Sequence, residues 1–327
     1  MRHFYLFICL ILLFSCDDDT TITQVTEEVG RGAVLRTIDT QNTALNINDL
    51  ASTFSLTLEE MDIEEGGLLD FIGVNVRFLD NTPENGLSST NSVLLESVPR
   101  SEFDFSGILP RNTFDYSLEE MLQATGISIN DVQVKDQFIL DLDLNLTDGR
   151  IFNEDNASSI ILAFDTFFSS PFSYTVTLVD PIPADAFTGF YTIESILDGP
   201  NGPTFVDENR IPLGEGDVIE ILASDDTNVR EFFVRHNLFH ITIELERRWT
   251  FTVAGNTTVF GKHQLSSPEG YCSFNAAPIL LGPGAENGEA NIIDDSVFEL
   301  WFVEGYLGFD GNCGFETAAS RYRFSKQ

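Results

Sequence analysis

Two tryptophans are the side chains of this chain best suited to contact a ligand. In residues 297–302 apolar and other positions alternate, so Glu299 and Trp301 share one face of a predicted strand, opposite three apolar residues. An exposed indole covers the apolar face of a pyranose, while a neighbouring carboxylate accepts its hydroxyls. Trp249, beside two arginines, is a second candidate. The alternative is that each tryptophan closes the edge of a core, because aromatic side chains are buried on average.

Two histidines four residues apart, His236 and His240, stand close to Glu244. On a helix this spacing would place two imidazoles on one face, as a zinc site requires. The surrounding residues alternate as a strand does, and there the two side chains would lie about 13 Å apart. We therefore expect solvent-facing strand histidines and no metal site.

Carboxylates are too abundant in this chain to mark a catalytic pair. It carries 52 Asp plus Glu against 17 Lys plus Arg, a formal net charge of −35. Adjacent carboxylates on a strand point to opposite faces, whereas a glycosidase needs two that face each other across a cleft. The sequence also has no Gly-x-Ser-x-Gly elbow and no His-Glu-x-x-His motif. We therefore predict that the protein is not an enzyme and needs no cofactor.

The negative charge also limits the partners. A chain this anionic repels phosphate backbones, so we predict no nucleic-acid partner and expect neutral or cationic ligands. Calcium is left open, since acidic loops such as Asp80 to Glu84 or Asp225-Asp226 would gain from a divalent counterion.

Period-two alternation dominates the elements that must position these residues. The run 138–146 has apolar residues at every even position and polar residues at 141, 143 and 145, and Asp148-Gly149 then turns the chain. The same alternation recurs at 54–58, 72–78, 172–178 and 239–245. One segment differs: Ser117 and Glu120 form a capping box, and Gly126 is placed to end a short helix near 117–125. We predict an all-β fold of antiparallel sheets, crossed by this helix.

Two prolines, Pro181 and Pro183, follow a predicted strand and precede a new one. Proline cannot extend a β-ladder and stiffens a linker. We therefore expect a first β domain over residues 30–180, a linker over 181–184 and a second β domain over 185–327. Each has the usual size of one β-sandwich or small barrel.

The first residues read as a targeting segment. One positive charge precedes an unbroken apolar run from Phe4 to Phe14, too short to cross a bilayer core of about 30 Å and typical of a signal peptide, here residues 1–15. Leu13-Phe14-Ser15-Cys16 resembles the bacterial lipobox. That resemblance implies a Cys16 that carries acyl chains such as palmitate, becomes the first residue of the mature chain and anchors it to a membrane. The alternative is an ordinary secretory signal with a chance cysteine.

Acidic residues follow the cysteine directly. Asp17, Asp18 and Asp19 begin a polar tether over residues 16–29 and resemble the export signal of surface lipoproteins from Bacteroidota. The resemblance implies the outer membrane, on its extracellular face. In enteric bacteria an Asp beside the lipidated cysteine instead resembles an inner-membrane retention signal, so the leaflet depends on the organism.

The first domain has the layout of a known module. From Ala33 through the capped helix to Tyr174, it resembles the immunoglobulin-like modules that recur in surface lipoproteins of Bacteroidota, including accessory proteins of glycan-uptake systems. The resemblance implies an immunoglobulin-like sandwich, which a second sandwich or small barrel follows.

The remaining cysteines fit an exported protein. Cys272 and Cys313 are left after the signal peptide and the lipidated residue are set aside, and in an oxidising compartment the simplest reading is a disulfide. Such a bond contributes roughly 2–4 kcal/mol.

Together these features predict a lipid-anchored cell-surface binding or accessory lipoprotein, with a glycan as the leading ligand. Two alternatives remain open. One is a structural or adhesive surface protein whose acidic faces are bridged by divalent ions or bind other outer-membrane proteins. The other is a binder of a small apolar ligand inside a C-terminal barrel.

Overall fold

The computed structural model describes residues 32–238, 246–267, 279–306 and 316–327, and Ala33–Gln327 form one compact unit. The predicted signal peptide, lipidated Cys16, the export signal Asp17 to Asp19, and the predicted Cys272–Cys313 disulfide therefore lie outside the described residues. No helix within the described ranges is long and apolar enough to span a bilayer.

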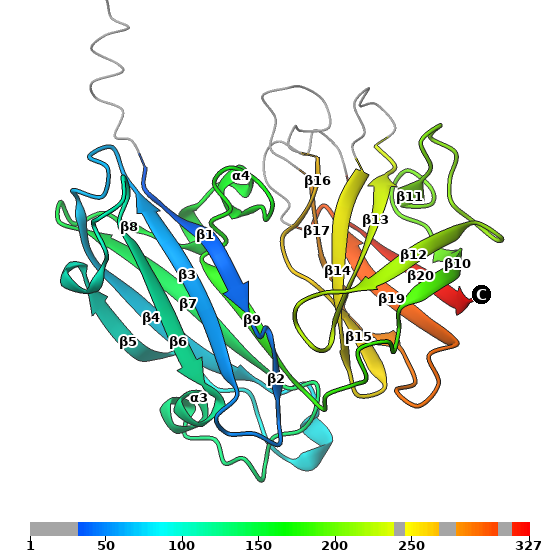
Figure 1. Ribbon diagram of the computed structural model, residues 1–327, viewed down its shortest axis with the longest axis horizontal. Helices are drawn as coiled ribbons and strands as arrows, with labels where there is room; N and C mark the ends of the chain where they lie inside the picture. The colour runs from blue at the N-terminus through cyan, green and yellow to red at the C-terminus, as the bar shows by residue number, and fades with distance from the viewer. Residues whose placement is uncertain (1–31, 239–245, 268–278, 307–315) are drawn as a thin grey trace, which may run out of the picture. The chain divides into compact units, whose positions relative to one another are not determined.

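The first half of the compact unit is a β-sandwich of two sheets (Figure 1). The smaller sheet has the order β1-β3-β6, with bounds Val34–Gln41, Thr53–Met61 and Arg111–Ser117. The larger has the order β2-β9-β7-β4-β5, with β8 beside β7 and bounds Ala44–Asn46, Ser173–Val179, Gln137–Leu146, Leu69–Leu79, Val93–Pro99 and Ile151–Phe152. Pairing is antiparallel except between β2 and β9. Apolar residues at alternate strand positions face each other between the sheets and form one core.

Short helices close the sandwich. Helix α3, Leu118–Thr125, begins at the capping box formed by Ser117 and Glu120 and ends at Gly126, which has φ of 70°, so the predicted helix is confirmed. The structure adds a second short helix, α4 (Ser159–Leu162), and three 3₁₀ turns at Pro83–Asn85, Arg100–Glu102 and Glu154–Asn156.

The second half is a single curled sheet of eleven strands. Its order is β16-β17-β19-β20-β10-β12-β13-β14-β15-β18, with β11 paired to β13. The bounds in chain order are β10 Gly189–Leu197, β11 Phe205–Val206, β12 Val218–Ala223, β13 Val229–His236, β14 Glu246–Ala254, β15 Thr257–Phe260, β16 Gln264–Ser267, β17 Ile279–Pro283, β18 Gly288–Glu289, β19 Val297–Glu304 and β20 Ala318–Lys326. About half of the described residues lie in strands and only short helices occur among them, so the all-β prediction is confirmed.

Aromatic side chains fill the inside of the curled sheet. Phe205 lies at ring distances of 4.7 Å from Tyr322, 5.5 Å from Phe302 and 5.6 Å from Phe232. All four are fully buried. This interior is a packed core.

Two small apolar clusters join the sandwich to the curled sheet. One contains Ala44 and Val179 from the sandwich with Val229 and Ala254 from the curled sheet. The other places Ala163, directly after α4, against Leu265, Leu280 and the ring of Tyr306. These contacts hold strands from both halves beside one cleft.

Candidate functional site

Trp249, one of the predicted sugar platforms, is fully buried. Its Nε1–H donates to the carbonyl oxygen of Val234 over 3.0 Å, and its ring packs against Phe205 and Phe260. Alternation along β14 turns positions 249, 251 and 253 inward together. The prediction of a ligand platform at Trp249 is therefore wrong, because the indole is part of the core.

Trp301 and Glu299 share the face of β19 opposite its buried apolar residues, Phe298, Leu300 and Phe302, as their alternation predicts. Glu299 is only 6% exposed, and its two carboxylate oxygens form ion pairs with Arg321 and Arg323. Trp301 is half-buried, and the guanidinium carbon of Arg321 lies 5.2 Å from its ring centroid. The predicted carboxylate is thus engaged within the protein, and a cation already covers the indole.

His236, predicted to face solvent, is 1% exposed. Its Nε2 lies 2.5 Å from an oxygen of Glu304, and its Nδ1 forms a hydrogen bond with Ser266. The prediction fails because alternation along β13 brings position 236 to the inner face, beside Trp249. His240 and Glu244 lie outside the described residues.

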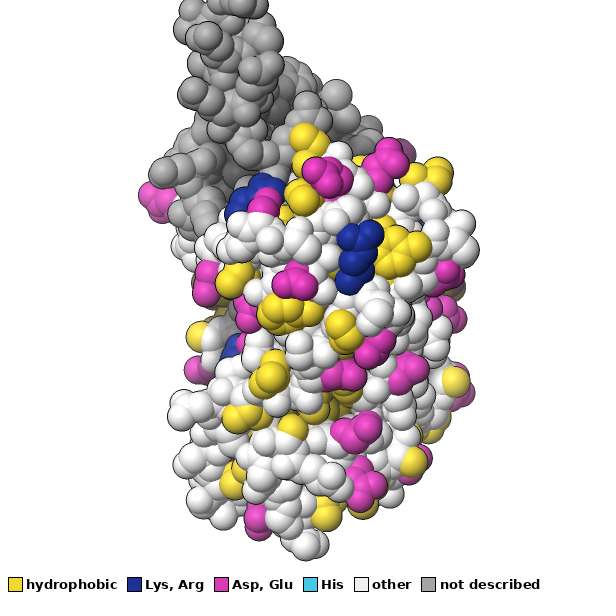
Figure 2. All heavy atoms as spheres, turned by 90° about the vertical axis from the view of Figure 1, so that its left-hand side faces the viewer, with side chains coloured by type: hydrophobic (Ala, Val, Ile, Leu, Met, Phe, Trp, Pro, Cys, Tyr) yellow, Lys and Arg dark blue, Asp and Glu magenta, His cyan; other side chains and the backbone are white. Residues whose placement is uncertain are grey.

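Among the described residues, carboxylates do not gather into a metal centre. Within the described parts of the chain, no group of three or more His, Cys, Asp or Glu side chains is arranged to hold a metal ion. Asp226, one of the loop residues considered for calcium, accepts hydrogen bonds from the Asn42 and Thr43 amides and from the Thr43 hydroxyl. On the face shown in Figure 2, acidic side chains are spread among polar and apolar ones.

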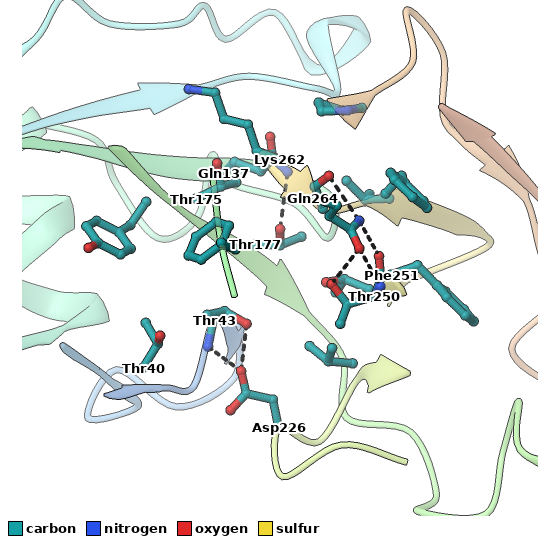
Figure 3. Close-up of a pocket in the computed structure, with 18 of the residues that line it drawn as sticks. Thr40, Thr43, Gln137, Thr175, Thr177, Asp226, Thr250, Phe251, Lys262 and Gln264 are labelled. Carbon is teal, nitrogen blue, oxygen red and sulfur yellow. Dashed lines mark hydrogen bonds between the residues drawn. The ribbon is translucent and has the colours of Figure 1, made fainter. Parts of the chain in front are cut away.

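The main candidate site is a cleft between the sandwich and the curled sheet, with a volume of about 980 Å³. Strands β1, β7 and β9 contribute one wall, and β14, β15 and β16 contribute the other (Figure 3). A cleft of this size accommodates a ligand of several hundred daltons.

The lining consists mostly of uncharged hydrogen-bonding groups. Eight threonines, three serines, two asparagines, two glutamines and one tyrosine contrast with five carboxylates and three basic residues. The local charge is thus close to balance, although the whole chain has acids three times as numerous as bases. Such a lining favours a neutral ligand that offers many hydroxyls.

Glutamine and aspartate side chains fix the geometry of the walls. The Oε1 of Gln264 accepts a hydrogen bond from the Thr250 amide at 2.6 Å, and its Nε2 donates to the Thr250 carbonyl at 2.9 Å. Gln137 donates to the Thr177 hydroxyl at 3.1 Å. Asp226 ties the curled sheet to Thr43 of the sandwich at one end of the cleft (Figure 3).

Three threonines in the lining keep their hydroxyls available. Thr40, Thr175 and Thr252 are half-buried, and their side chains form no hydrogen bond with any described residue. They come from β1, β9 and β14, on both walls. A ligand in the cleft would meet hydroxyl donors and acceptors without displacing an internal hydrogen bond.

A second polar link lies beside the cleft. Glu154 of the sandwich forms an ion pair with Lys262 and accepts a hydrogen bond from His263 Nε2 at 3.1 Å, while the hydroxyl of Tyr306 lies 2.6 Å from His263 Nδ1. Burial raises the pKa of Glu154, but the His263 hydrogen bond and the Lys262 charge outweigh it and lower the pKa to about 2. Burial lowers the pKa of His263, so its neutral form is favoured.

Aromatic rings line part of the cleft. Tyr174, Phe251 and Phe260 are buried in its walls, whereas Phe164 is half-buried and exposes part of its ring. Phe164 follows α4, and its amide donates to the carbonyl of His263. This residue, rather than a tryptophan, gives the cleft a partly exposed apolar surface.

Comparisons with known proteins give no assignment. No family model matches the chain, and no curated protein matches it.

Sequence reasoning missed the cleft because its residues are far apart in the chain. Thr40 and Thr252 are separated by more than two hundred positions and meet only through tertiary packing. Alternation predicted the strand that carries Thr175 but made no prediction for the strands that carry Thr40 and Thr252. It contains no information on which faces of different sheets lie opposite each other.

Proposed function

We propose that this protein is a lipid-anchored cell-surface binding protein that takes a neutral, polyhydroxylated ligand, most simply an oligosaccharide, in the cleft between the sandwich and the curled sheet. The observation that carries the proposal is the lining, in which uncharged hydrogen-bonding side chains outnumber charged ones two to one. The partly exposed ring of Phe164 adds an apolar surface among these polar groups.

The physical chemistry of sugars supports this ligand class. Sugar hydroxyls both donate and accept hydrogen bonds and carry no charge, so hydroxyl and amide side chains match them without desolvating an ion. Fixed side chains such as Gln264 and Gln137 keep the walls in place, so little ordering cost falls on binding.

The packing of the curled sheet supports the cleft over its interior as the ligand site. Buried rings such as Phe205, Phe232 and Phe302 occupy the interior. A small apolar ligand would have to displace them.

The surface location belongs to the same proposal. Acylation of Cys16 followed by Asp17 to Asp19 would leave the compact unit on a tether outside the cytoplasm, where polysaccharides are found. We propose that this membrane is the outer membrane and that the compact unit lies on its extracellular face.

A glycan array tests the ligand class. The purified chain without its leader should bind neutral oligosaccharides in preference to sulfated or uronic-acid ones. The variant Thr40→Val/Thr175→Val should lose about tenfold in affinity, since each hydrogen bond contributes about 0.5–1.5 kcal/mol. Thr147→Val, which changes an exposed threonine outside the cleft lining, is the matched control and should bind as the wild type does. Absence of binding by the wild type, or equal binding by the double variant, would refute the proposal.

A further inference from the structure

A buried polar network lies within the curled sheet, apart from the cleft lining. It joins five side chains from separate segments, each no more than 4% exposed: Thr204, His236, Ser266, Glu304 and Ser320. Glu304 Oε1 accepts hydrogen bonds from the hydroxyls of Thr204 at 2.5 Å and Ser320 at 2.8 Å. Glu304 Oε2 faces His236 Nε2, and His236 Nδ1 faces the hydroxyl of Ser266.

The acceptor character of Glu304 determines where the proton of His236 lies. An ionised carboxylate only accepts hydrogen bonds, so Nε2 of His236 is the nitrogen that carries the proton and donates. In the neutral imidazole Nδ1 is then an acceptor, and Ser266 must donate its hydroxyl proton to it. This is the order nucleophile, base and orienting carboxylate that activates a serine.

The backbone at Ser266 supports the same reading independently. Strand β16 pairs with β17 through Leu265 and Ser267, and the register shifts between them, so Ser266 is the extra residue of a bulge. A bulge leaves one residue unpaired and re-aims its side chain, and bulges are over-represented beside active sites. Here the bulge coincides with the residue whose hydroxyl contacts His236.

We infer that Ser266 is a base-activated nucleophile for acyl transfer from small carboxylic esters, with His236 as the general base and Glu304 as its positioning residue. Ser266 is only 4% exposed, so the acyl group must be small, and acetyl esters are the substrate class. This inference does not depend on the proposed function of the cleft.

The chemical steps balance with water as the second reactant. Ser266 Oγ forms a bond to the carbonyl carbon, its proton passes to His236 Nδ1, and the bond from carbon to the alkoxy oxygen breaks as the imidazolium protonates the leaving alcohol. Water then forms a bond to the acetyl carbon and gives one proton to His236 Nδ1. The bond from that carbon to Ser266 Oγ breaks, the serine oxygen takes the proton from the imidazolium, and acetic acid leaves.

A second histidine, His263, lies in a similar chain of hydrogen bonds, to which we assign a structural role only. His263 also lies between a carboxylate, Glu154, and a hydroxyl, that of Tyr306. The Tyr306 oxygen also accepts the backbone amide of His263, and Glu154 is shared with Lys262. A phenol held in this way links two parts of the fold, whereas the Ser266 hydroxyl is an aliphatic nucleophile on a bulge.

The test begins with the unmutated chain. After incubation with diisopropyl fluorophosphate, peptide mass spectrometry should find one phosphoryl adduct on Ser266, formed as the P–F bond breaks and fluoride leaves. Hydrolysis of p-nitrophenyl acetate should proceed through an acetyl adduct on the same residue. A folded wild-type chain that acquires no adduct at Ser266 would overturn the inference.

Variants test whether labelling of Ser266 depends on His236 acting as a base. His236→Asn should slow labelling about 100-fold or more, as loss of a general base does. Ser266→Ala should abolish the adduct, while Ser106→Ala, an exposed serine of the sandwich, should leave it unchanged. An unchanged labelling rate in a His236→Asn variant that keeps the wild-type near-UV circular dichroism would overturn the inference.

Discussion

The cleft and the buried network of the curled sheet contain similar polar side chains, which differ in solvent exposure and in hydrogen-bond partners. In the cleft, threonines such as Thr40, Thr175 and Thr252 are half-buried and form no side-chain hydrogen bond with a described residue. In the network, hydroxyls of the same kind are below 5% exposed and bonded to Glu304 or His236.

This difference shows that solvent access and existing partners, rather than residue type, decide what a polar side chain can do. A half-exposed hydroxyl with hydrogen-bonding capacity left over can bind a ligand at little cost to the fold. A buried hydroxyl inside a network contributes to stability, and it gains reactivity only where a base receives its proton.

Removing the centre of the network should cost the most stability. Glu304→Leu removes the acceptor that Thr204, Ser320 and His236 share. The Thr204–Ser320 hydrogen bond remains, but the buried donors of Ser320 and His236 lose their acceptor, so the free energy of unfolding should fall by about 3–5 kcal/mol. Thr175→Val in the cleft should change it by less than about 0.5 kcal/mol. Urea denaturation of both variants measures the difference, and a similar loss in the two would contradict the contrast.

Glu60 is a buried carboxyl that, unlike Glu304, has no hydrogen-bond partner for either oxygen among the described residues. Burial, with the nearby charge of Asp62, raises its pKa to about 8. Between about pH 4.5 and 8 the unfolded chain releases this proton while the folded chain keeps it, so stability falls as pH rises through that window.

Glu60→Gln should therefore remove this decline, which amounts to about 5 kcal/mol over the full window. The variant should match the wild type near pH 4 and exceed it at pH 8. Urea midpoints across this range provide the measurement. A wild type and variant that run in parallel would show that Glu60 ionises freely in the folded state.

Glu154, beside the cleft, should show the opposite dependence. Its folded pKa of about 2 lies below the ordinary value of 4.5, so its stabilisation is present above pH 4.5 and is lost as pH falls toward 2. Because its side chain is 28% exposed, solvent screening reduces the effect to about 1–2 kcal/mol. Glu154→Gln should lower stability by this amount at pH 6 and by much less at pH 2.5. A deficit that persists at low pH would point to lost packing instead of lost charge.

The smallest expected effect concerns salt. A neutral ligand in a cleft of nearly balanced charge should bind with an affinity that changes less than about twofold between low salt and 0.5 M NaCl. Calorimetric titration of the best ligand from the array gives this value. A tenfold fall in affinity would indicate a charged ligand.

The sequence predicted the elements better than the sites. Alternation predicted strands, the capping box at Ser117 predicted helix α3, and the face shared by Glu299 and Trp301 was confirmed. Local patterns contain no information on which strand faces meet in the fold. They therefore did not predict that Trp249 and His236 turn into the core. Nor did they predict the ion pairs of Glu299 with Arg321 and Arg323. Ser266, His236 and Glu304 are separated by thirty or more positions, so no contiguous motif marks their meeting.

The location of the oligosaccharide site can be measured by calorimetric titration of a neutral oligosaccharide that binds the wild type, repeated with Thr175→Val/Thr252→Val and Trp301→Ala. For a ligand in the cleft, we expect about a tenfold loss of affinity in the double threonine variant and less than a twofold change in Trp301→Ala. A large loss in Trp301→Ala together with wild-type affinity in the double threonine variant would place the ligand on β19 and rule out the cleft.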